Sequence, residues 1–152
     1  MEIFNSIWTA LSTPNEGLLS ILLIPANIIE TVITMYLFLN VIKLNSTTIQ
    51  KIVYVICICI ISKFTMLLVP GPFNIFVNYI FIILLAYIIF KNPFLKTSAS
   101  VVISLIIFNL IGTLILNPYL TILNINTENL NSIPIYRISY IMLVFIITFF
   151  IS

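Results

Sequence analysis

Two opposite charges lie deep inside long apolar stretches and are the residues best placed to do chemistry. Glu30 lies in the stretch IPANIIETVITMYLF and Lys63 in the stretch CIISKFTM. Measured along helices from Ile42 and Ile52, both charges lie about 17 to 18 Å from the same membrane face. An isolated charge at mid-membrane costs from about 2.5 to more than 10 kcal/mol. We therefore predict that Glu30 pairs with Lys63 or is protonated. Such a pair would either fix helix register or form part of a switch.

Three amides in the apolar stretches add polar groups to this region. Asn27 lies one helical turn before Glu30, and Asn78 and Asn109 lie in later apolar stretches. Amides of this kind usually join membrane helices through hydrogen bonds. Taken together, they predict a polar seam within a helix bundle, where a ligand could bind.

Enzymatic chemistry is not expected within these residues. The chain has no histidine and only four acids, and it contains no phosphate-binding loop or zinc-protease motif. Cys57 and Cys59 are two residues apart, which is neither a metal-ligand spacing nor a redox motif. We therefore predict no catalytic residue, no metal and no cofactor. The small net charge of +2 is scattered and does not favour a nucleic-acid partner.

The composition is that of a membrane protein. Hydrophobic residues make up 62% of the chain, charged residues only 7%, and the mean hydropathy is +1.28. The apolar stretches are continuous rather than alternating, which favours helices over a membrane barrel. We predict an all-α, polytopic transmembrane helix bundle that forms a single domain over residues 1–152. Its five spans are expected at about 18–42, 52–69, 74–90, 97–116 and 135–151.

Lysines set the expected orientation. Lys43 and Lys51 flank one loop, Lys91 and Lys96 flank another, and neither loop contains an acid. The positive-inside rule places both loops in the cytoplasm, with the N-terminus outside and the C-terminus cytoplasmic. Residues 1–16 are then an external, interfacial lead-in helix. On the same side, residues 120–131 contain a possible short helix capped by Asn126 or Thr127.

The order of these parts resembles a known family, the N-terminal membrane sensor domains of accessory-gene-regulator-type histidine kinases from low-GC Gram-positive bacteria. The resemblance rests on hydropathy and loop texture in SIWTALSTPNEGLL, IPANIIETVITMYLF, VPGPFNIFVNYI and FKNPFLKTSASVVIS. It implies a multi-pass protein of the plasma membrane that senses a peptide pheromone in a quorum-sensing two-component system. It also implies a cytoplasmic histidine kinase domain beyond this chain, through which a homodimer would form. A peptide-like signal would then contact Trp8, Phe73, Tyr119 and residues 120–131.

Two alternatives remain open. The chain could be a small-molecule-binding transport subunit, with Glu30, Lys63, Asn78 and Asn109 lining a site at the bilayer midplane. It could also be a structural membrane partner whose contacts are lipid and other membrane proteins.

Overall fold

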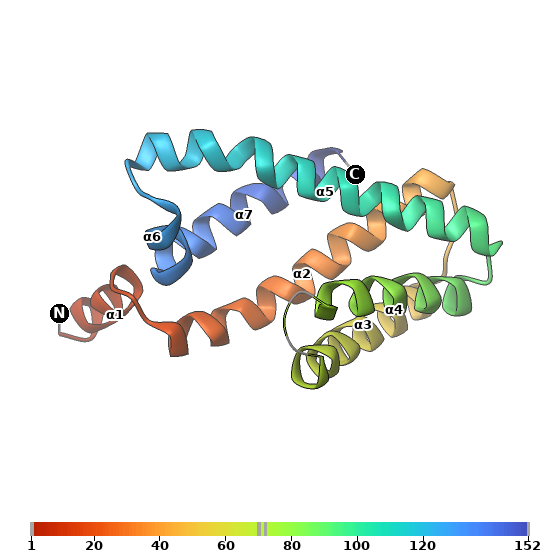
Figure 1. Cartoon of the computed structure of the whole chain (residues 1–152), viewed down its shortest axis with the longest axis horizontal. Helices are drawn as coiled ribbons and strands as arrows, with labels where there is room; N and C mark the ends of the chain where they lie inside the picture. The colour runs from red at the N-terminus through yellow and green to blue at the C-terminus, as the bar shows by residue number, and fades with distance from the viewer. Residues whose placement is uncertain (1, 70, 72, 152) are drawn as a thin grey trace. The chain divides into compact units, whose positions relative to one another are not determined.

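A computed structural model describes residues 2–69, 71 and 73–151 of the chain. These residues form seven α-helices and no strand (Figure 1). In chain order the helices are α1 (Glu2–Ser12), α2 (Glu16–Ile42), α3 (Thr48–Leu68), α4 (Phe73–Phe90), α5 (Phe94–Leu123), α6 (Thr127–Ser132) and α7 (Pro134–Ile151). The prediction of an all-α chain is confirmed.

Five of the described helices are long and apolar enough to cross a membrane: α2, α3, α4, α5 and α7. They correspond one to one with the five predicted spans. Their exposed residues include many isoleucines, leucines and phenylalanines, as is expected of surfaces suited to lipid. The chain thus has the helices of a multi-pass membrane protein.

The predicted ends were least accurate in α3 and α5. Helix α3 begins four residues before the predicted Ile52, because Thr47 and Gln50 form a capping box. In that box Thr47 Oγ1 accepts from the Gln50 N–H at 3.3 Å, and Gln50 Oε1 accepts from the Thr47 N–H at 3.0 Å. Helix α5 continues to Leu123, beyond the predicted 116, because Pro118 is accommodated inside it. A proline removes a single backbone donor, which a membrane helix tolerates.

The chain divides into two compact units, which we name the lysine unit and the terminal unit. The lysine unit comprises residues 30–108 and contains all five lysines of the chain. The terminal unit comprises residues 2–29 and 109–151. Helices α2 and α5 each contribute one part to each unit. The expectation of a single domain stays a prediction.

An aromatic and aliphatic core holds the lysine unit together. Phe38, Tyr54 and Phe90 come from three different helices, and their ring centroids lie 5.4 to 5.5 Å apart. Ala86 on α4 is fully buried beside them, so the adjacent helices α3 and α4 can approach closely (Figure 1). The remaining buried members of the core are Met35, Leu39, Ile42, Ile58 and Val101.

Hydrogen bonds join the helices of the terminal unit. The Tyr140 hydroxyl donates to the Gly112 carbonyl at 2.9 Å and joins α7 to α5. The Asn15 N–H donates to the Ser132 carbonyl at 3.3 Å, so the start of α2 is tied to the end of α6. Helix α6 packs beside α7, and α1 also contacts α7. The segments expected on the external face therefore contact the last span.

Candidate functional site

The two mid-membrane charges differ in their surroundings. Glu30 is half-buried on α2, and Lys63 is exposed on α3; both belong to the lysine unit. Lys63 is followed by exposed Phe64, Met66 and Leu67, so it lies on a face suited to lipid. A pair buried within the bundle was expected, whereas the Lys63 side chain lies at the surface of its unit. The pairing of Glu30 with Lys63 stays a prediction, and the exposure of Lys63 weighs against a sealed pair.

The three amides of the predicted seam lie in different units. Asn78 belongs to the lysine unit, where its Oδ1 accepts a hydrogen bond from Ser62 Oγ at 3.0 Å. This bond joins α4 to α3, so Asn78 contributes to packing. Asn27 and Asn109 belong to the terminal unit, where both are exposed. No single unit therefore contains the whole seam.

Of the predicted peptide contacts, Trp8 and Tyr119 belong to the terminal unit, whereas the exposed Phe73 belongs to the lysine unit. Trp8 is 54% exposed on α1, beside the exposed Phe4 and Ile7. Tyr119 has a structural role, because its hydroxyl donates to the Tyr136 carbonyl at 2.8 Å and contacts Ser139 Oγ. The Trp8 side chain is thus exposed and could contact a ligand, whereas the Tyr119 hydroxyl joins α5 to α7 by a hydrogen bond.

The short helix predicted within residues 120–131 is present as α6. Asn126 is its N-cap, and Asn126 Oδ1 accepts from the Asn129 N–H at 2.8 Å. Asn131, near the end of α6, accepts a hydrogen bond from Arg137 Nη1 at 2.7 Å. That bond gives Arg137, the one cation outside the lysine unit, a partner close to the start of α7.

The lysine unit has a basic end, which we name the lysine end and define as residues 43–51 and 91–97. Gln50 Nε2 donates to the Ile89 carbonyl at 2.9 Å, so the start of α3 and the end of α4 lie together. The end carries four lysines and no acid: Lys43, Lys51, Lys91 and Lys96. These residues stand where helices long enough to cross a membrane begin and end, the positions at which membrane helices usually carry cations.

Two of these lysines adopt an unusual backbone conformation. Lys43 has a φ of 55° and Lys91 a φ of 51°, in the left-handed region. Lys43 follows α2, where its N–H donates to the Asn40 carbonyl and the Leu44 N–H donates to the Leu39 carbonyl, both at 3.1 Å. This is the Schellman pattern, in which glycine or asparagine is usual. Both lysines place a cation at the negative end of a helix dipole.

Sequence reasoning missed a groove at the lysine end. Its volume is about 310 Å³, and it lies between the second half of α2 and the first half of α3. Lys51 Nζ lies 4.8 Å from the centre of the Tyr36 ring at this groove. The flanking lysines identified the region in the sequence, but the contact between Lys51 and Tyr36 depends on the packing of two helices.

Buried polar atoms without a hydrogen-bond partner also occur at the lysine end. Within the described ranges they are Ser46 Oγ, Asn92 Nδ2 and Thr97 Oγ1. Among all the residues that the structure describes, no three histidine, cysteine, aspartate or glutamate residues are grouped so that they could hold a metal ion. Its four lysines make the lysine end suited to anions.

Comparison with known protein families, with curated proteins and with solved structures found no match to this chain.

Proposed function

We propose that the chain is a membrane sensor domain that receives a peptide-like signal at its terminal unit and relays it through α7 to a cytoplasmic histidine kinase. The observation that supports this proposal is the direct connection between surface segments and the last span. Helix α1 contacts α7, and the Asn15 N–H donates to the Ser132 carbonyl of α6. A ligand that moves α1 or α6 would act directly on α7.

The signal-receiving surface in this proposal is the exposed apolar side of α1. Phe4, Ile7 and Trp8 are 71%, 55% and 54% exposed. A peptide with an apolar face could bind there from the outer leaflet, and would shift α7 only if it bound two arrangements of the unit unequally. A shift from 1:99 to 99:1 requires about 5.5 kcal/mol of differential affinity.

The single tryptophan of the chain gives a direct test. The protein in lipid nanodiscs would be titrated with peptide fractions from spent medium of its host bacterium, and the emission of Trp8 recorded. We expect a saturable blue shift that Phe4→Ala weakens, since Phe4 lies on the same helix. The matched control, Phe64→Ala, alters an exposed phenylalanine of the lysine unit and should change nothing. If no fraction produces a saturable shift, the sensor proposal fails.

The proposed orientation has the lysine end in the cytoplasm and α6 outside, so that the kinase lies on the C-terminal side of α7. Cysteines placed at Asn92 and at Asn126, in a background without Cys57 and Cys59, test this. An impermeant thiol reagent added to intact cells should label the cysteine at 126 and spare the cysteine at 92. Labelling at 92 alone would invert the topology.

The transport alternative receives less support from the geometry. Its midplane site requires Asn78, which is engaged with Ser62, and Asn109, which belongs to the other unit. It also requires the charge of Lys63, which is exposed on α3.

A further inference from the structure

The groove at the lysine end has an apolar part and a polar part. Its apolar lining comes from Val32, Met35, Ile52, Val55 and Ile56. Ile52 and Ile56 are each 53% exposed, so the groove opens on the surface that faces lipid. Its volume of about 310 Å³ is at the lower end of the range of ligand sites. A narrow apolar groove that opens toward lipid is suited to an acyl chain.

The polar part of the groove is cationic. Thr48 and Lys51 line it, one turn apart at the start of α3. Lys51 Nζ lies over the Tyr36 ring at 4.8 Å, which restricts the position of the ammonium group. At the start of α3 the Gln50 N–H is capped by Thr47, while the N-terminus of the helix carries a partial positive charge. Thr48, Lys51 and the start of α3 thus present donors and positive charge to an anion.

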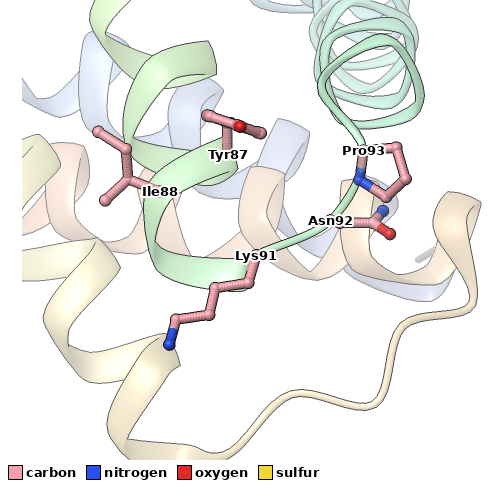
Figure 2. Close-up of a pocket in the computed structure, with 5 residues that line it drawn as sticks. All are labelled: Tyr87, Ile88, Lys91, Asn92 and Pro93. Atoms are coloured by element: carbon pink, nitrogen blue, oxygen red, sulfur yellow. The ribbon is translucent and has the colours of Figure 1, made fainter.

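A second cavity at the same end is a weaker candidate. It has a volume of about 440 Å³ and is lined by Tyr87, Ile88, Lys91, Asn92 and Pro93 (Figure 2). The figure shows the Lys91 side chain extending away from Asn92, so these two polar groups do not converge on one point. The groove beside Lys51 is the better binding site because its polar and apolar parts are continuous.

We infer that this groove binds one anionic phospholipid, with an acyl chain against Val32, Ile52 and Ile56 and the phosphate at Lys51 and Thr48. Charge complementarity supports this occupant, because the lysine end carries four lysines and no acid. Anionic lipids concentrate in the cytoplasmic leaflet, where basic pockets between membrane helices bind their headgroups. The inference depends on the membrane placement of the helices and not on the sensor function.

Lipid retention tests the inference directly. The purified chain would be offered equal amounts of dioleoyl phosphatidylglycerol and dioleoyl phosphatidylcholine, and the retained lipids counted by native mass spectrometry. We expect phosphatidylglycerol to be preferred, and Lys51→Gln to lower its affinity about fivefold, the usual effect of one lysine at a membrane surface. The matched control is Lys63→Gln, on the same helix but outside the groove, which should keep the preference. Equal retention of both lipids by the unaltered chain would overturn the inference, as would equal losses in the two variants.

A second measurement leaves the lysines unchanged. In a Trp8→Phe background, Ile56→Trp places a single tryptophan in the groove. Brominated phosphatidylglycerol should quench this tryptophan more strongly than brominated phosphatidylcholine. The control variant Ile80→Trp reports from α4, where Ile80 is exposed outside the groove, and should be quenched equally by both lipids. Equal quenching at position 56 would contradict a headgroup-selective site.

Discussion

The two units of the chain differ in the most prominent contacts between their helices. In the lysine unit, Phe38, Tyr54 and Phe90 pack edge to face around a core of aliphatic side chains. In the terminal unit, the tyrosine hydroxyls of Tyr119 and Tyr140 bridge α5 and α7 by hydrogen bonds. Lipid tails are as apolar as leucine, so apolar burial alone does not make membrane helices associate. Close packing and interhelical hydrogen bonds both contribute to their association. The cluster of three rings is a feature of the lysine unit, and the tyrosine hydroxyl bonds are a feature of the terminal unit.

The same difference bears on function. A packed core resists small displacements of its helices, because any displacement changes many van der Waals contacts between side chains at once. A few hydrogen bonds can be exchanged for others at lower cost. The terminal unit, which contains the proposed signal surface, is thus the easier of the two to rearrange.

The largest expected effect comes from the core of the lysine unit. Phe38→Ala should lower the free energy of unfolding by about 3 to 5 kcal/mol, because it leaves a cavity among buried rings. Thermal unfolding of the purified protein in detergent would measure the loss. The control Phe64→Ala removes an exposed ring from α3 and should cost much less. Equal losses would show that the packed core does not dominate this unit.

A smaller loss is expected from the hydrogen bonds of the terminal unit. Tyr140→Phe removes the bond to the Gly112 carbonyl and keeps the ring, so we expect a loss of about 0.6 to 1.7 kcal/mol. The same substitution at Tyr79 is the control, since the structure describes no hydrogen bond of the Tyr79 hydroxyl. A loss at Tyr140 as large as that of Phe38→Ala would erase the distinction between the units.

The positions of the spans along the chain were predictable from the sequence, but the contacts between the spans were not. Continuous apolar runs of membrane length predicted five helices, and Asn126 was recognised as a possible cap because capping is local in sequence. The earlier start of α3 was also encoded locally, in Thr47 and Gln50. The bond between Tyr140 and Gly112 joins residues 28 positions apart and depends on helix register, which the apolar pattern does not specify. The exposure of Lys63 likewise depends on helix rotation, and depth alone could not predict it.

A double-mutant cycle on Glu30 and Lys63 tests whether the lysine unit also depends on a polar pair. Because Lys63 is exposed, we expect the losses from Glu30→Gln and Lys63→Met to add within about 0.5 kcal/mol. Thermal unfolding of the four variants in detergent would give the coupling energy. A coupling between about 0.5 and 3 kcal/mol would instead establish the pair predicted from depth. It would also add a charged contact to the bond between Ser62 and Asn78 that already joins α3 to α4.

The last comparison concerns one turn that occurs in both units. Asn124 follows α5 as Lys43 follows α2, and both have a left-handed backbone, with φ of 53° and 55°. In each case the next N–H donates back to a carbonyl of the last turn, from Leu44 to Leu39 and from Ile125 to Leu120. Glycine adopts this conformation without strain, and asparagine tolerates it better than lysine does.

Lys43→Gly should therefore raise the free energy of unfolding by about 0.5 to 1 kcal/mol, and Asn124→Gly should raise it less. Thermal unfolding in an uncharged detergent would measure both, without anionic lipid to favour the lysine. Repeating the measurement in phosphatidylglycerol nanodiscs adds anionic headgroups around the protein. There the gain from Lys43→Gly should shrink, because the lost cation no longer attracts the headgroups, while the effect of Asn124→Gly should stay the same. If Lys43→Gly gains equally in both media, its charge has no part in holding the lysine end at the membrane surface.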